Sequence, residues 1–138
     1  MVTFKVQWDN GKKIIPVENV DQLDAALDRV AQERGPKGRV FVVDITNGED
    51  FDAIPIGLHM TVGHPVRNKV IWIGPGDGIG CEPDVEPWHG EEIVFDYGHL
   101  PTEEPPEYLR VSPEKAREAA REFIRTNMRP TCLLWDKP

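Results

Sequence analysis

Residues 2–17 read VTFKVQWDNGKKIIPV, and this stretch decides which kind of fold the chain can adopt. Its first half alternates polar residues with apolar ones, the period-two pattern of a half-buried strand: Val2, Phe4, Val6 and Trp8. Asn10-Gly11 follows, the dipeptide that best fits the two positive-φ positions of a type I′ turn. We therefore expect residues 12–17 to run back beside the first strand, with Pro16 near an edge or an end.

Two amphipathic helices follow from the spacing of apolar residues further along the chain. The first lies in residues 20–30, with Asn19 or Asp21 as its N-cap and Gly35-Pro36 after its end. The second opens at Ser112-Pro113-Glu114, where serine caps, proline occupies the first turn and glutamate favours the helix dipole. Its predicted buried stripe is small and apolar: Ala116, Ala119, Ala120, Phe123 and Ile124. Its predicted outward face is basic: Lys115, Arg117, Arg121 and Arg125.

Strand-like runs occupy most of the chain between these helices: residues 39–46, 54–62, 69–74 and 91–98. Turn-forming residues separate the first three runs, which predicts an antiparallel meander. A last strand is expected at residues 131–135. Residues 74–90 are rich in Gly and Pro and predict a long exposed loop, and residues 101–107 predict an extended surface segment.

The order ββ-α-ββββ-α-β predicts an α+β fold, a mostly antiparallel sheet with two helices packed on one face. A chain of 138 residues can bury a core without a metal or a disulfide, so we expect one domain over residues 1–138 and unpaired Cys81 and Cys132. No apolar run approaches the roughly 20 residues that span a bilayer, and the start lacks the pattern of a signal peptide. We therefore expect a cytoplasmic protein, with a monomer favoured.

The net charge of −8 is concentrated in residues 70–109, which contain no lysine or arginine. Ten of the 24 acidic residues lie in this acidic segment: Asp77, Glu82, Asp84, Glu86, Glu91, Glu92, Asp96, Glu103, Glu104 and Glu107. The other 14 acids and all 16 basic residues lie outside, so the segment carries −10 and the remainder +2. Phosphate binding needs clustered Lys and Arg, so this charge argues against nucleic acid as a direct ligand and for a partner with a basic surface.

Two interpretations of the acidic segment stay open. In the first, the acids only solvate two loops and keep a small protein in solution. In the second, Trp88, Tyr97 and Tyr108 lie among the acids because aromatic anchors ringed by charge are typical of protein interfaces. Core packing would account for each ring as well.

The sequence matches no established pattern for a metal, a phosphate or an activated nucleophile. The histidines fit no zinc spacing: His59, His64, His89 and His99. Asp50 and Asp52 lack the other ligands of a calcium loop, and the glycines of residues 74–80 lack the order of a phosphate loop. Ser112, the only serine, is expected to be a helix cap, and neither cysteine has a basic neighbour in sequence. We expect no metal, no cofactor and no catalysis.

Residues 94–135, VFDYGHLPTEEPPEYLRVSPEKAREAAREFIRTNMRPTCLLW, resemble immunity protein family one of bacterial polymorphic toxin systems. Members show a tyrosine-containing strand, a glycine, an acidic and proline-rich stretch, a helix of the form VREAVREF, and then RPTCVEW. The matching residues here are Tyr97-Gly98, Glu103-Glu104-Pro105, residues 116–123, and 129–132 with Trp135. The family's recurrent phenylalanine and tryptophan correspond to Phe123 and Trp135, which we interpret as core residues.

The resemblance covers residues 70–138 well and the first half only in layout, a hairpin followed by a helix. It departs at Leu133-Leu134, where relatives often carry a polar or acidic residue, and in the long acidic loop after Gly74. Members usually accompany toxins of the deaminase fold, whose nucleic-acid grooves are basic. The resemblance thus implies a partner with a basic surface, which the charge of the acidic segment also favours.

We therefore expect an antitoxin, not an enzyme, that covers the basic active-site groove of a cognate toxin, a nucleic-acid-targeting deaminase. The acids expected to mimic phosphates are Asp77, Glu82, Asp84, Glu86, Glu91, Glu103, Glu104 and Glu107, with Trp88 and His99 as buried anchors. Two alternatives stay open. A small enzyme would bring His89 and His99 together beside a carboxylate in a pocket. An assembly subunit would pair through an edge strand such as residues 2–8.

Overall fold

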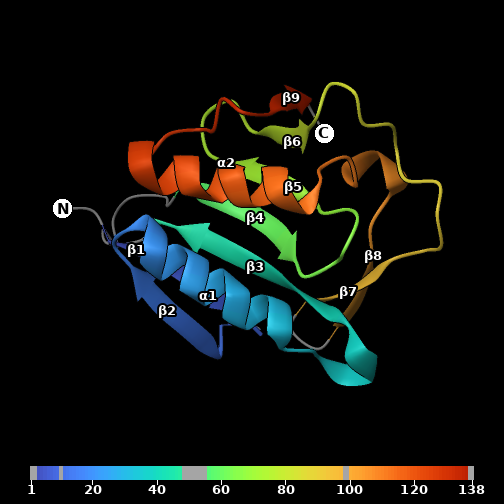
Figure 1. Ribbon diagram of the computed structural model, residues 1–138, viewed down its shortest axis with the longest axis horizontal. Helices are drawn as coiled ribbons and strands as arrows, with labels where there is room; N and C mark the ends of the chain where they lie inside the picture. The colour runs from blue at the N-terminus through green and yellow to red at the C-terminus, as the bar shows by residue number, and fades with distance from the viewer. Residues whose placement is uncertain (1–2, 10, 48–55, 98–99, 137–138) are drawn as a thin grey trace.

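The computed structural model of the chain describes residues 3–9, 11–47, 56–97 and 100–136. These residues form a nine-stranded sheet, and two helices lie on one of its faces (Figure 1). The α+β fold and the mostly antiparallel sheet are as predicted. No helix within the described ranges has both the length and the apolar character needed to cross a membrane.

The hairpin predicted at the start of the chain is confirmed. β1 (Phe4–Trp8) and β2 (Lys13–Val17) pair antiparallel, and every second residue of β1 is buried. Asp9 and Gly11 lie within the turn with φ of 56° and 75°, whereas Asn10 and Val2 lie outside the described residues. β2 is an edge strand of the sheet, the position where a proline such as Pro16 is tolerated.

β3 (Val40–Thr46) is the strand around which the sheet is organised. It pairs antiparallel with β1 through residues 43–46 and in parallel with β7 (Val94–Tyr97) through residues 40–41. The sheet therefore forks along this edge of β3. β8 (Leu100–Glu103) pairs with β7 on the outer side of the fork.

The other edge of β3 continues the sheet without interruption. Each strand is antiparallel to the one before it, in the order β4 (Gly57–Val62), β5 (Val70–Ile73), β6 (Gly78–Cys81) and β9 (Leu134–Asp136). The first two of these strands confirm the predicted meander. Asp50 and Asp52, which precede β4, lie outside the described residues.

Both helices begin at their predicted caps. α1 (Val20–Gln32) starts where Asn19 Oδ1 accepts a hydrogen bond from the backbone N–H of Gln22, at 2.9 Å. α2 (Pro113–Thr126) starts where Ser112 Oγ accepts one from the N–H of Lys115, at 3.2 Å. Such caps satisfy backbone donors that have no partner inside the helix, and each contributes about 1 kcal/mol.

Phe123 of α2 lies at the centre of the main core and has no exposed surface. Its ring packs edge-on against Phe4 of β1 and Trp72 of β5, with centroids 5.2 Å and 5.6 Å apart. Trp135 packs against the same core and donates from Nε1 to the carbonyl of Pro130 at 2.8 Å. Phe123 is thus a core residue and Trp135 packs against the core, in agreement with our interpretation of both residues.

Two predictions about local structure were wrong. Residues 74–90 contain the buried strand β6 and are therefore not wholly an exposed loop. Residues 101–103 are extended at the surface in β8, as predicted, and a short 3-10 helix follows at residues 106–108. A Cβ atom at Gly78 would lie 2.8 Å from the carbonyl oxygen of Asp136, so this glycine lets two strands approach and does not mark a loop. Arg117 and Arg121 do not simply face outward, because both reach Asp24 of α1, Arg121 Nε at 2.9 Å.

Two buried ion pairs attach the acidic segment to the rest of the molecule. Glu104, after β8, pairs with Lys69, before β5, and the two side chains are 5% and 6% exposed. Asp96 of β7 has no exposed surface and accepts from Arg39 Nη2 at 2.9 Å. Burying a carboxylate without a cation costs several kcal/mol of free energy, roughly, so Glu104 and Asp96 are buried only where Lys69 and Arg39 can pair with them.

Replacing Lys69 by methionine should destabilise the protein far more than replacing an exposed lysine. Lys69→Met leaves Glu104 buried and unpaired, so the free energy of unfolding should fall by about 3–5 kcal/mol in urea titrations. Lys115→Met, which breaks an exposed pair with Glu118, should change this free energy little. The double variant Lys69→Met/Glu104→Leu should recover most of the loss, and equal losses from the two single variants would refute the assignment.

Candidate partner-binding surface

The loop of residues 82–93 joins β6 to β7 and carries five of the ten acids of the acidic segment. Its first residues are attached to the body of the protein by hydrogen bonds. Glu82 Oε1 accepts from the backbone N–H of Ser112 at 2.6 Å, and Arg110 Nε donates to the carbonyl of Val85 at 3.0 Å. Arg67 Nη1 donates to the carbonyls of Glu86 and Leu109, at 2.6 Å and 3.0 Å. Apart from the Glu82 carboxylate, the loop is held through its backbone carbonyls, which leaves its other carboxylates available.

Trp88 is the aromatic centre of this loop. Its indole Nε1 donates to the carbonyl of Glu91 at 2.7 Å, and the guanidinium of Arg67 lies 5.6 Å from its ring centre. The ring of His64 approaches it edge-on at 6.0 Å. A Cβ atom at Gly90 would lie 2.0 Å from the indole, so only glycine fits there. Trp88 is half-buried in a fixed orientation, with one side still open.

A small second core supports the loop on the sheet face opposite the helices. Its buried members come from β3, β7 and the flanking loops: Val42, Ile93, Phe95 and Leu109. Trp88 packs against this cluster. The backbone N–H of Trp88 donates to the carbonyl of Pro106 at 3.3 Å, which brings η2 (Pro106–Tyr108) beside the loop.

The structure separates the ten acids of the segment into two groups. Three bind within the chain: Glu82, Asp96 and Glu104. Seven are exposed: Asp77, Asp84, Glu86, Glu91, Glu92, Glu103 and Glu107. The exposed acids of the loop, β8 and η2 lie on neighbouring elements, whereas Asp77 lies before β6 and Glu82 after it, at opposite ends of that strand.

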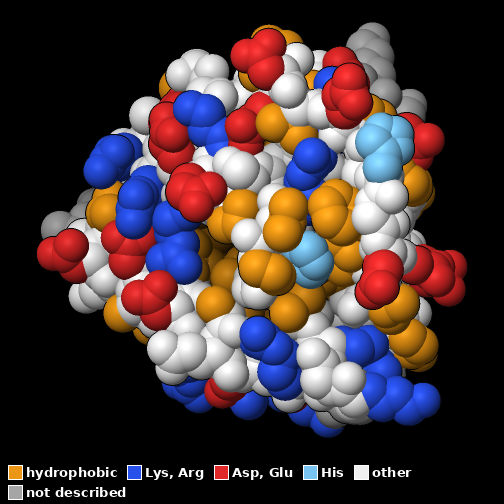
Figure 2. Space-filling view, turned by 45° about the vertical axis from the view of Figure 1, so that its right-hand side comes forward, with side chains coloured by type: hydrophobic (Ala, Val, Ile, Leu, Met, Phe, Trp, Pro, Cys, Tyr) orange, Lys and Arg blue, Asp and Glu red, His pale blue; other side chains and the backbone are white. Residues whose placement is uncertain are grey.

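Two hollows meet at Trp88 and Glu92. One, of about 480 Å³, has mainly apolar walls that include Ile93 and Pro105, with Glu103 and Glu104 at its side. The other, of about 540 Å³, extends past Val40 and His64. We call the two together the Trp88 groove. Figure 2 shows a face of the molecule on which hydrophobic side chains gather in a hollow, with acidic side chains at several points around it and basic ones along its lower edge.

Glu92 was not among the residues predicted to contact a partner, yet it stands in the middle of this groove. A hydrogen bond with Glu103 and repulsion between the two carboxylates raise the pKa of Glu92 above its ordinary value. No sequence pattern indicates this pair, because it depends on the pairing of β7 with β8. His64 and Arg67 were not predicted either, because they lie outside the acidic segment and reach Trp88 only in the folded chain.

The residues considered for chemistry are placed as follows. His89 is largely exposed, 3.7 Å from Glu86, and His99 lies outside the described residues. His59 Nδ1 lies 2.7 Å from Asp44 Oδ1, which fixes the imidazole ring in one orientation. Across the described part of the chain, no three His, Cys, Asp or Glu side chains gather as metal ligands would.

Cys81 and Cys132 are free thiols, as predicted. Burial raises the pKa of both, and that of Cys132 reaches about 11. Because the thiolate is the nucleophilic form, both side chains remain protonated and unreactive at neutral pH.

A comparison with protein families places this arrangement among known proteins. No curated protein matches the sequence. The family model described as immunity protein Imm1 matches residues 11–137, which include both helices, the acidic segment and the residues around Trp88. The chain therefore belongs to the Imm1 family of immunity proteins.

Proposed function

We propose that this chain neutralises a cognate toxin that has a basic surface, a nucleic-acid-targeting deaminase, by covering its active-site groove. The observation that carries the proposal is the exposure of seven carboxylates in a segment without lysine or arginine. Those beside the Trp88 groove occupy the positions where a basic partner would meet them. Family membership supports the immunity role, and the charge supports the kind of partner.

The proposed contact set follows from which acids the chain leaves available. It comprises Asp84, Glu86, Glu91, Glu92, Glu103 and Glu107, with Trp88 as the aromatic anchor. Glu82 and Glu104 have partners within the chain, and we propose that they position the surface. Asp77 precedes β6, at the end of the strand opposite Glu82, and would contact only a partner that extends that far. His99, which lies outside the described residues, keeps its proposed role as an anchor.

The proposal is tested first by co-expressing the chain with the product of the neighbouring gene. A stable complex that co-purifies, together with rescue of cells that express that product, is the expected result. If no complex forms and the cells are not rescued, the proposal is refuted.

Electrostatic steering should make the association rate depend on the acids near the groove. The variant Glu86→Lys/Glu91→Lys should associate with the toxin at least about tenfold more slowly in stopped-flow experiments at low salt. The control Glu18→Lys/Glu118→Lys makes the same change in net charge elsewhere on the surface and should have a small effect. Added salt should slow association of the wild type more than it speeds dissociation, because the Debye length falls to about 8 Å at 0.15 M ionic strength. Equal effects of the two variants would contradict steering by this surface.

Binding of a basic toxin should release a proton from the Glu92 and Glu103 pair. In the free protein the raised pKa of Glu92 keeps its carboxyl group protonated to a higher pH than that of an ordinary glutamate. A cation brought by the toxin favours the ionised form, so affinity should weaken as the pH falls through the pKa of Glu92. Glu103→Gln removes the repulsion and should flatten this dependence, measured by calorimetry over pH. An affinity with the same pH dependence in both proteins would exclude Glu92 from the interface.

A further inference from the structure

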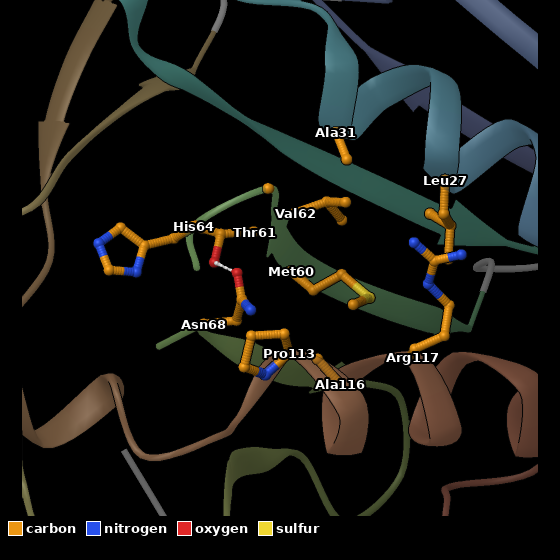
Figure 3. A pocket seen from close by; sticks show the side chains of 11 residues that line it. Leu27, Ala31, Met60, Thr61, Val62, His64, Asn68, Pro113, Ala116 and Arg117 are labelled. Atoms are coloured by element: carbon orange, nitrogen blue, oxygen red, sulfur yellow. Dashed lines mark hydrogen bonds between the residues drawn. The ribbon is translucent and has the colours of Figure 1, made fainter. Parts of the chain in front are cut away.

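A separate pocket of about 220 Å³ opens between α1 and α2 (Figure 3). Its walls are largely apolar side chains of the two helices and of β4: Leu27, Ala31, Met60, Val62 and Ala116. The pocket exists because Ala31 of α1 and Ala116 of α2 line it, where longer side chains would fill the space between the helices. Further along, Arg117 bridges the helices through Asp28, its Nη1 lying 2.9 Å from Oδ1.

The buried side chain of Asn68 contributes a polar group to this pocket. Thr61 Oγ1 accepts from the backbone N–H of Lys69 at 2.9 Å and donates its hydroxyl proton to Asn68 Oδ1 at 3.1 Å. Thr61 is 0% exposed and Asn68 2% exposed. The opposite placement of the amide would leave the buried hydroxyl without an acceptor, so the network fixes the oxygen toward Thr61.

The amide nitrogen of Asn68 therefore faces the pocket, on the side of Pro113 and Met60 (Figure 3). Among the residues that the structure describes, nothing accepts a hydrogen bond from it. An amide N–H directed into an otherwise apolar pocket can donate to a ligand that places an oxygen in this position.

His64 connects this pocket to the Trp88 groove, because this residue lines both, and its ring points away from Met60 and Ala116 (Figure 3). Its Nδ1 accepts from the backbone N–H groups of Val66 and Arg67, both at 3.1 Å. Burial lowers the pKa of His64, which favours the neutral ring with its proton on Nε2. The Asn68 amide N–H is the side-chain donor that would select an acceptor here.

We propose that this pocket receives a tyrosine side chain of the toxin, with its ring between the helices and its phenol oxygen accepting from Asn68. The inference rests on the proposed function, since it names the chemistry of the toxin's anchor. Apolar cavities of about 150 Å³ hold a benzene ring, whereas most small-molecule sites exceed about 300 Å³, so the size suits one aromatic side chain. Aromatic residues seated in pockets dominate the energetics of many interfaces.

Charge also agrees with this occupant. Glu91 and Glu92 lie in the groove that His64 shares with the pocket. A neutral tyrosine with basic residues next to it would fill the pocket and place its neighbours against these carboxylates. A phenylalanine in the same place would leave the Asn68 amide without an acceptor.

The pocket is tested on the free protein with p-cresol and toluene, the side-chain analogues of tyrosine and phenylalanine. In NMR titrations p-cresol should bind more tightly than toluene, shift the methyl signals of Leu27 and Met60, and shift the Asn68 side-chain amide. Ala31→Leu, which fills the pocket, should abolish this binding, whereas Ala25→Leu on the exposed side of α1 should leave it unchanged. Equal binding of p-cresol to both variants would overturn the assignment.

The occupant is tested on the complex. Ala31→Leu should weaken toxin binding by about tenfold or more, with Ala25→Leu as the matched control. On the toxin side, one tyrosine changed to phenylalanine should weaken binding, and the same tyrosine changed to alanine should weaken it further. If no tyrosine matters and Ala31→Leu binds as tightly as the wild type, the pocket does not receive a toxin tyrosine. A wild type that forms no complex at all would refute the proposed function, while the p-cresol result would still decide whether the pocket binds phenols.

Discussion

Burying a charged carboxylate in a protein is costly unless a cation accompanies it, and residues 70–109 contain no lysine or arginine. The buried acids of this segment therefore pair with Arg39 and Lys69, which come from other parts of the chain. Arg67 and Arg110 bind the backbone carbonyls of the same segment. These contacts fasten the β6–β7 loop and β8 to the sheet, and they leave the remaining carboxylates at the surface.

This division of the acids matters for recognition. Because the loop is held through its backbone and Trp88 is fixed by Gly90, Arg67 and His64, little ordering is needed when a partner binds. A surface that is already ordered loses less entropy on association than a flexible one. In the proposed function, the exposed acids would govern how fast a basic toxin associates, and the Trp88 groove with its neighbouring pocket would govern how fast it dissociates.

Much of the fold could be predicted because its signals are local. Alternation in β1, the caps at Asn19 and Ser112 and the stripe around Phe123 all concern residues close in sequence. β6, β8 and the parallel pairing of β7 with β3 could not, since they depend on partners far along the chain. Gly78 and Gly80 were taken as loop residues although they allow close strand packing. For the site, the sequence alone identifies the acidic segment. It does not show which acids are buried, because Glu104 and Asp96 are buried through pairs with Lys69 and Arg39, which lie far away in the sequence.

Hydrogen exchange of the chain, alone and bound to the product of its neighbouring gene, tests the central claim most directly. If the acidic surface and the Trp88 groove form the interface, peptides from residues 82–93 and 100–108 will gain protection in the complex. Peptides from the edge strand β2, at the other side of the sheet, will exchange as before. Protection that appears at β2 and leaves residues 82–93 unchanged would contradict the account and favour pairing through the sheet edge.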